Sequence, residues 1–177
     1  MSAHAHLREA TRSAHDRVDS AFGGYDLTDA DDYAAFLLGH AAVFMPIEEA
    51  LDRGGAAQFL ADWSESRRSQ LLSQDLADLG IDAPSMIGPH SFKSEAALLG
   101  ALYVIEGSRL GGAMLRRSVP ADKPSRFLSA VHSQGRWRTF VATLEESLHS
   151  TVRLHEATAS ALQTFALFER VAVRSVV

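Results

Sequence analysis

The sequence predicts an all-α protein that forms one domain. Apolar residues recur at steps of three and four through most of the chain, and no segment alternates cleanly between apolar and polar side chains. Glycine pairs and prolines separate the periodic segments, as expected at helix ends. The 177 residues are enough to bury a substantial core, so we expect a single domain over 1–177 in which residues 1–5 fray.

Each predicted helix follows from its apolar spacing and from the residues that end it. The first has an apolar face from Leu7 to Phe22 and stops at Gly23. The second contains Pro46, which removes the hydrogen bond to the carbonyl of Ala42 and predicts a kink. The expected elements are helices over 5–22, 28–53 and 56–79, a loop over 81–92, a central helix over 98–115, a loop bracketed by Pro120 and Pro124, a short helix over 127–131, and a long helix that follows Gly135 and reaches about Val173.

The central helix has an unusual composition. Its sequence, LLGALYVIEGSRLGGAML over 98–115, contains four glycines, and each costs a helix interior about 1 kcal/mol relative to alanine. Gly107 and Gly111 are four residues apart and share a face. Two explanations stay open: another helix packs closely on that face, or a flat ligand lies against it where any side chain would collide. The charged residues in the run argue against a membrane span.

Composition and charge exclude several classes of function. The formal net charge is −5, with 17 basic and 22 acidic side chains, so the chain has no basic excess for nucleic acid. It has no cysteine, which excludes disulfides, thiolate catalysis and iron–sulfur clusters. The segment 1–16 contains no apolar stretch of the kind that a signal peptide needs. We therefore expect a cytoplasmic protein that binds neither nucleic acid nor a membrane.

The eight histidines are the main candidates for a metal site, and none belongs to an HExxH motif. His40 falls on an apolar face of the second predicted helix, which favours a core or pocket-wall residue over a ligand. His15 shares the inward face of the first helix with Thr11, and a lone inward histidine is more often structural. The others are expected in the frayed terminus, for His4 and His6, or in loops and at the surface, for His90, His132, His149 and His155.

His15 and the glycine-rich helix together point to a more specific interpretation. An iron porphyrin needs an axial nitrogen on one face and an open position with room for dioxygen on the other. A buried imidazole on one helix and a glycine face on another meet both needs. A neutral imidazole also leaves the iron able to bind dioxygen, whereas a thiolate favours O–O cleavage.

Two segments resemble a known family. LREATRSAHDRVD at 7–19 and LGALYVIEGSRLGG at 99–112 are similar to the proximal and distal helix motifs of heme oxygenases, especially the bacterial kind found beside bacteriophytochromes. DWSESRRSQLLSQDLADLG at 62–80 and PIE at 46–48 resemble the same branch. The resemblance covers most of the chain, over about 7–170.

The resemblance implies a compact helical fold that holds heme b, iron protoporphyrin IX, between the first helix and a kinked central helix. Heme is both cofactor and substrate in this family. The implied reaction is oxidative cleavage of heme by dioxygen and supplied electrons to biliverdin, carbon monoxide and ferrous iron. His15 matches the proximal iron ligand, and Gly107, Gly111 and Gly112 match the distal glycines.

Ser108 departs from the family pattern, because animal members carry an acidic residue there to organise water. Its hydroxyl and the neighbouring backbone amides are the expected hydrogen-bond donors on the distal side. Arg138 is a candidate partner for a heme propionate, with Arg8 as the second, although a solvated helix face explains each equally well. Thr11 and Tyr103 are further candidates for contacts with heme.

The sequence contains no flavin or nicotinamide motif, so a ferredoxin or a reductase is expected to supply electrons. A bacteriophytochrome is a candidate acceptor of the biliverdin, and iron release is the other purpose considered. Three other functions stay open. They are a heme-binding module without turnover, which the serine at 108 allows; a thiaminase-like or cofactor-ring-oxidising enzyme on the same scaffold; and a helical adaptor.

Overall fold

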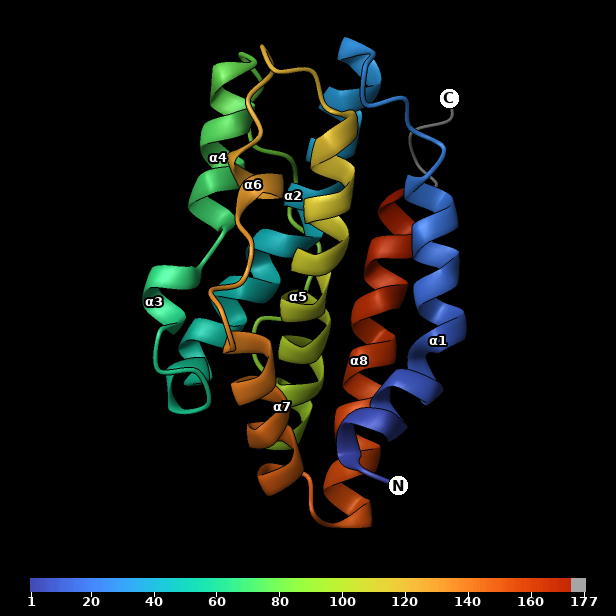
Figure 1. Cartoon of the computed structure of the whole chain (residues 1–177), viewed down its shortest axis with the longest axis vertical. Helices are drawn as coiled ribbons and strands as arrows, with labels where there is room; N and C mark the ends of the chain where they lie inside the picture. The colour runs from blue at the N-terminus through green and yellow to red at the C-terminus, as the bar shows by residue number, and fades with distance from the viewer. Residues whose placement is uncertain (173–177) are drawn as a thin grey trace.

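Helices make up all the regular secondary structure of the described residues, 1–172, in the computed structural model (Figure 1). This confirms the predicted all-α class. The long helices are α1 (Ala3–Phe22), α2 (Ala30–Arg53), α5 (Glu95–Leu115) and α8 (Thr151–Ala172). Shorter elements lie between them: η1 (Ala56–Gln58), α3 (Trp63–Ser66), α4 (Ser69–Asp78), η2 (Arg116–Ser118), α6 (Arg126–Ser129) and α7 (Arg136–Ser147), where η marks a 3-10 helix.

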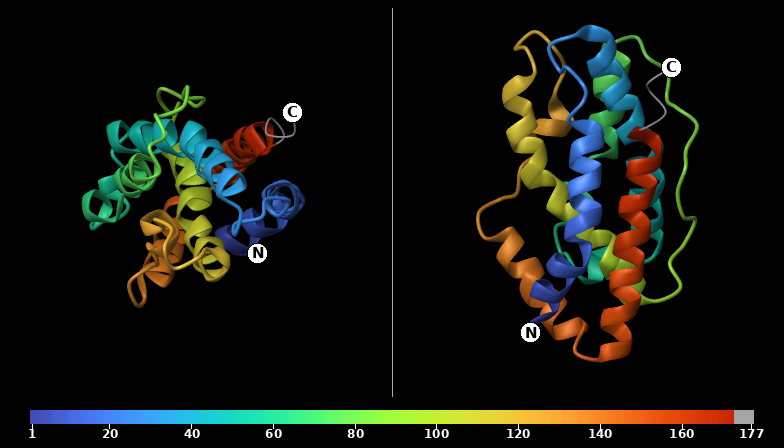
Figure 2. Two further views of the ribbon diagram at one scale, coloured as in Figure 1. Left: turned by 90° about the horizontal axis from the view of Figure 1, so that it is seen from above. Right: turned by 90° about the vertical axis from the view of Figure 1, so that its right-hand side faces the viewer.

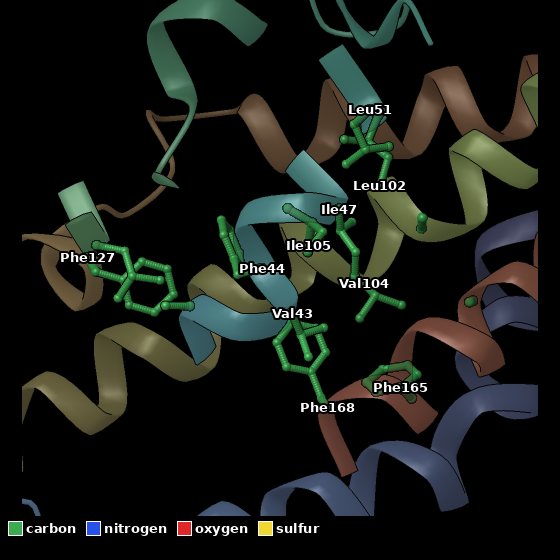
Figure 3. Close-up of a cluster of buried hydrophobic side chains, with 14 of the residues drawn as sticks. Val43, Phe44, Ile47, Leu51, Leu102, Val104, Ile105, Phe127, Phe165 and Phe168 are labelled. Atoms are coloured by element: carbon green, nitrogen blue, oxygen red, sulfur yellow. The ribbon is translucent and has the colours of Figure 1, made fainter. Parts of the chain in front are cut away.

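Helix α5 lies at the centre of the molecule, and the other helices surround it (Figure 1). Helix α8 packs along both α5 and α1, and α2 packs against α4, α5 and α8. The views in Figure 2 show the resulting elongated bundle, in which α5 curves along its length. Figure 3 shows an apolar cluster where α2, α5, α6 and α8 meet, with Val43, Phe44, Ile47, Leu51, Leu102, Val104, Ile105, Phe127, Phe165 and Phe168.

Helix α2 is a core helix. By length and composition alone it is apolar enough to cross a membrane, but 61% of its most apolar window is buried inside the protein, so packing accounts for its composition. Pro46 lies within α2 and leaves the carbonyl of Ala42 without its helical partner. That carbonyl accepts a hydrogen bond from Ile87 N at 2.6 Å. The loop between α4 and α5 thus replaces the bond that proline removes.

Three helices begin at a carboxylate that comes from a different helix. The first turn of a helix has N–H groups without helical partners, and a carboxylate satisfies them while matching the positive end of the helix dipole. Such a contact explains why residues 3–5, which were expected to fray, are helical. Glu145 of α7 accepts from Ala3 N and His4 N at 2.7 and 3.0 Å, Glu48 of α2 accepts from Arg68 N and Ser69 N at 2.8 and 2.7 Å, and Asp75 of α4 accepts from Arg126 N and Phe127 N at 3.0 and 2.9 Å.

The predicted helix over 56–79 is wrong as a single element. It consists of η1, α3 and α4, and the last break falls at residues 67–68, where Glu48 binds the backbone. The central helix begins three residues earlier than predicted, at Glu95, because the hydroxyl of Ser94 caps it.

The predicted last helix is also wrong as a single element, because α7 ends at Ser147 and α8 begins at Thr151. Arg153 Nε donates to the carbonyl of Ser147 at 2.6 Å, which satisfies one of the open carbonyls at the end of α7. The hydroxyl of Ser150 accepts from Arg153 N at 3.3 Å, as an N-cap does. The predicted helix end near Val173 lies outside the described residues.

Candidate functional site

A cavity of about 570 Å³ lies between α1 and α5. Helix α1 forms one wall, the glycine-rich part of α5 forms the other, and aromatic side chains from α2, α6 and α8 line the remaining sides. Its size and its mostly apolar lining are typical of pockets that enclose a small organic ligand. At one end His4, Tyr103 and Trp137 pack edge to face or tilted, with ring centroids about 6 Å apart.

The glycines of α5 face two different environments. A Cβ atom at Gly100 would lie 2.0 Å from the carbonyl oxygen of Ala157, so this glycine permits close packing of α8. A Cβ at Gly111 would meet no atom within 4 Å, and one at Gly107 would meet only an indole ring at 3.8 Å. One at Gly112 would touch a leucine at 3.6 Å. Because Gly107 and Gly111 line the cavity, the structure favours the ligand explanation for their shared face.

His15 projects from α1 into the cavity. Its Nδ1 lies 3.2 Å from a carboxylate oxygen of Asp19, one helical turn further on, and its ring meets Phe165 edge to face at 5.8 Å. The expectation of a buried imidazole is wrong, because the side chain is 56% exposed where α1 borders the open cavity. When Nδ1–H donates to the carboxylate, Nε2 keeps its lone pair free, which is the usual arrangement of a histidine that binds a metal.

Arg68 supplies a buried cation on the α5 side of the cavity. It is 1% exposed, and its Nη2 donates to the carbonyl of Ile105 at 2.6 Å and to Ser108 Oγ at 2.7 Å. The guanidinium carbon lies 4.6 Å from the ring centre of Phe44 and 5.1 Å from that of Phe127. Burial lowers its pKa to about 9, so the side chain is still charged at neutral pH.

The contacts of Ser108 correct one expectation. Its hydroxyl donates to the carbonyl of Ile105 at 2.7 Å and accepts from Arg68, so its proton points back into α5 instead of into the cavity. Sequence reasoning missed Arg68 altogether. The chain carries two adjacent arginines, Arg67 and Arg68, and no periodic signal distinguishes the one that enters the core.

His40 forms part of the cavity lining, as the pocket-wall interpretation predicted. Its Nδ1 lies 2.9 Å from the carbonyl of Phe36, and its ring lies 4.2 Å from that of Phe22. A carbonyl only accepts, so Nδ1 carries the proton and Nε2 is the acceptor nitrogen. Burial lowers the pKa of His40 to about 4, which keeps the ring neutral at physiological pH.

The remaining sequence candidates divide between the cavity and the surface. Arg8, Thr11 and Tyr103 line the cavity, and burial raises the pKa of Tyr103. Thr11 Oγ1 donates to the carbonyl of Leu7 at 2.8 Å, so the hydroxyl proton is already bound. Arg138 is exposed and does not line the cavity, whereas its neighbour in the chain, a tryptophan, does.

An ionic cluster outside the cavity lining holds α5 in place. Glu106 is 1% exposed and accepts from Arg109 Nε at 3.1 Å and from Arg136 Nη1. Arg136 Nε also donates to Asp62 at 2.8 Å. His132, which was expected at the surface, is largely buried here, with Nε2 3.1 Å from the Glu106 carbonyl. The cluster joins the distal part of α5 to the start of α7.

These groups fit heme. Within residues 1–172 no group of three or more histidine, aspartate and glutamate side chains could hold a metal ion. A single imidazole such as His15 suits an iron whose other ligands come with the cofactor, as the four porphyrin nitrogens do. The open glycine face leaves space for a flat ring on the other side of the cavity. Fold and site together define a helical heme-binding protein.

Comparison with known proteins identifies the family of the chain. No protein-family model matches the sequence. A heme oxygenase from Xanthomonas campestris pv. campestris is 36% identical over 146 residues, which are 79% of this chain and 88% of that protein. The chain therefore belongs to the heme oxygenase family. The heme oxygenase PigA from Pseudomonas aeruginosa is 28% identical over 152 residues, which are 78% of this chain and 75% of PigA.

Solved structures agree with the fold. The heme oxygenase of Neisseria meningitidis, solved with NO and CO bound, superposes with a TM-score of 0.86 at 24% identity, covering 98% of this chain and 92% of that one. The heme oxygenase of Leptospira interrogans superposes with a TM-score of 0.76 at 20% identity, covering 98% and 100%. At these identities the likeness establishes the fold, and the helical heme oxygenase architecture that the sequence implied is confirmed.

Proposed function

We propose that this chain binds heme between α1 and α5 and cleaves it oxidatively, with dioxygen and external electrons, to biliverdin, carbon monoxide and ferrous iron. The observation that carries the proposal is the pairing of His15, backed by Asp19, with the open glycine face of α5 in one apolar cavity. Membership of the heme oxygenase family supports it. Bound heme supplies the iron at which dioxygen is activated.

On the α1 side, His15 is the iron ligand that we assign. The carboxylate of Asp19 lies 3.2 Å from Nδ1, where it can accept the Nδ1 proton and leave the lone pair of Nε2 for the iron. Thr11, one turn earlier, offers no hydroxyl proton to heme, because that proton is bound to the Leu7 carbonyl. Arg8 lies two turns before His15 and makes no ion pair within the described residues, so it is the propionate partner that we propose.

On the α5 side, Arg68 provides fixed positive charge and N–H groups. A charge that is already in position stabilises negative charge as it develops on a reacting oxygen, with no cost of reorganisation. Ser108 Oγ accepts from the guanidinium and holds it in place, so Arg68 and not residue 108 provides the polar group on this wall. This explains why an acidic residue at 108 is not needed. Gly107, Gly111 and Gly112 keep that wall free of side chains.

The assignment of His15 is tested by titration of the purified protein with hemin. The parent is expected to develop a Soret band, and His15→Ala to abolish or shift it because the axial nitrogen is lost. His155→Ala is the matched control, since it removes an exposed histidine of α8 that does not line the cavity. A His15→Ala protein whose titration and spectrum match the parent would contradict the assignment.

We also propose the partners and location of the enzyme. The absence of a flavin or nicotinamide motif supports an external ferredoxin or reductase as electron donor. The resemblance of 62–80 to the bacteriophytochrome-associated branch supports a bacteriophytochrome as the acceptor of biliverdin. We place the enzyme in the cytoplasm, where a sequence that has no cysteine suits the reducing conditions. A strain without the enzyme distinguishes the two purposes. Loss of growth on heme as the iron source would indicate iron release, and loss of photoreceptor assembly would indicate chromophore supply.

A further inference from the structure

Glu48 lies on α2, outside the cavity lining, and its carboxylate is fully buried. Its two oxygens accept hydrogen bonds from the backbone N–H groups of Arg68 and Ser69, at 2.8 and 2.7 Å. At these residues the chain passes from α3 into α4. A buried carboxylate whose oxygens are both hydrogen-bonded holds its partners firmly, because separating them leaves buried polar groups unsatisfied.

Glu48 is also one of two buried carboxylates whose charges favour the Arg68 cation, and Glu106 is the other. The guanidinium donates only to neutral oxygens, on Ile105 and Ser108, and its Nε is buried with no partner among residues 1–172. A buried cation without an opposite charge nearby is strongly disfavoured. Burial lowers the pKa of Arg68, the positive charges of Arg109 and Arg136 lower it further, and the charges of Glu106 and Glu48 raise it.

The side chain of the neighbouring arginine, Arg67, is held by two carboxylates of α2. The side chain of Arg67 turns outward, is 37% exposed, and donates from Nη1 to Asp52 at 3.1 Å. Asp52 lies one helical turn after Glu48. Arg67 Nε also lies 4.0 Å from Glu48 Oε2, so Asp52 and Glu48 together hold the Arg67 side chain at the surface. Glu48 in addition holds the backbone from which Arg68 extends into the cavity wall.

We propose that Glu48 is a positioning residue for heme chemistry: by binding the backbone N–H groups of Arg68 and Ser69 it fixes the start of α4, and this keeps the Arg68 cation beside Ser108 in the cavity wall. The inference rests on the proposed function, since Arg68 acts on heme only if heme occupies the cavity. If Glu48 served only as a cap of α4, its removal would lower stability and leave the electrostatic field at the heme unchanged.

The test is the carbon monoxide stretching band of the ferrous heme complex, measured by infrared spectroscopy. A positive charge beside bound carbon monoxide increases electron donation from iron into the ligand and lowers the stretching frequency, so loss of that charge raises it. We expect Arg68→Met to move the band to higher wavenumber and Glu48→Gln to move it in the same direction. In an Arg68→Met background, Glu48→Gln is expected to add no further shift.

Asp75→Asn is the matched control. Asp75 is also fully buried and also accepts from two backbone N–H groups at a helix start, but its charge is not among those that shift the pKa of Arg68. It should lower the thermal stability as Glu48→Gln does but shift the band clearly less, because Asp75 reaches the Arg68 guanidinium only through the neutral ring of Phe127. A band that moves as far in Asp75→Asn as in Glu48→Gln would overturn the proposal, because general loosening would then explain both.

Two other results would overturn it: a Glu48→Gln band at the parental position while that of Arg68→Met is shifted, or an unshifted Arg68→Met band. If Glu48→Gln does not fold, Glu48→Asp replaces it, because aspartate keeps the charge on a shorter side chain. Its band must shift in the same direction as that of Arg68→Met and by less. An unchanged band in Glu48→Asp contradicts the proposal. Failure of the proposed function looks different, because the parent would then form no heme complex that depends on His15.

Discussion

The two halves of α5 use glycine for opposite purposes. In the first half, the carbonyl of Ala157 occupies the space that a side chain at Gly100 would need, 2.0 Å from the position of a Cβ. In the second half, the space beside Gly111 holds no atom within 4 Å and opens on the cavity. Glycine within a helix therefore serves close packing at one site and leaves room for a ligand at the other. Only the surroundings of each glycine distinguish the two roles.

The packed half predicts the largest effect on stability. Gly100→Ala places a methyl group against backbone of α8, which cannot move aside as a side chain does, so we expect the free energy of unfolding to fall by about 3 kcal/mol. Urea denaturation of the heme-free protein measures this change. A Gly100→Ala protein as stable as the parent would show that α5 and α8 do not pack so closely there.

The cavity beside the open half of α5 is also lined by His40 of α2, and this residue predicts a dependence on acid. Burial lowers the pKa of His40 from its ordinary 6.5 to about 4, so between these values the unfolded chain binds a proton that the folded protein does not. Stability therefore falls as the pH falls through this window, and His40 contributes a slope of at most about 1.4 kcal/mol per pH unit.

Denaturation curves between pH 4 and 7 measure this contribution of His40. His40→Gln, which retains a hydrogen-bonding side chain, should flatten the pH dependence of the free energy of unfolding in this window. His155→Gln, at an exposed position, should not. Parallel curves for the parent and His40→Gln would refute the lowered pKa and the neutral state of this ring.

Two substitutions at Gly111 test the open half: a small side chain should raise stability, and a large one should weaken heme binding. Gly111→Ala is expected to stabilise the heme-free protein by about 0.5–1 kcal/mol, since alanine is the better helix former and its methyl group meets no atom. Gly111→Leu should weaken hemin binding by about tenfold, or 1.4 kcal/mol, because the side chain projects into the cavity. Equal hemin affinity in the parent and Gly111→Leu would show that the heme lies elsewhere.

The smallest effect concerns the two candidate propionate partners. Arg8 borders the cavity and Arg138 does not, although both are exposed. Arg8→Gln should weaken hemin binding by less than about 1 kcal/mol, because an exposed ion pair is screened by water and salt. Arg138→Gln should leave it unchanged. Biliverdin isomer analysis provides a second measure, since propionate contacts fix the rotation of the heme in its plane.

Features that depend on local spacing could be predicted from the sequence. The side of α1 that borders the cavity follows from its periodicity, and the glycine face of α5 from the spacing of Gly107 and Gly111. A prediction that one particular residue of a helix faces the cavity fails when the helix begins one residue away from the expected position. Neighbouring helical residues point about 100° apart, and this explains why the tryptophan before Arg138 lines the cavity in its place.

Features that depend on partners distant in the chain could not be predicted. Arg68 enters the cavity wall because a carboxylate 20 residues earlier binds its backbone and because Ser108, 40 residues later, accepts from its side chain. The break at residues 67–68 has the same cause. The exposure of His15 depends on how far α1 stands from α5, which no property of α1 alone determines.

The central claim is that the cavity between α1 and α5 is a site where heme is cleaved and not only held. An absorption time course of the hemin complex in air, with a reductant and with catalase to remove free peroxide, tests it most directly. We expect the Soret band to disappear while a bilin band rises in the red. A stable Soret band, or bleaching without a bilin band, would contradict it and would leave a heme-binding protein without turnover.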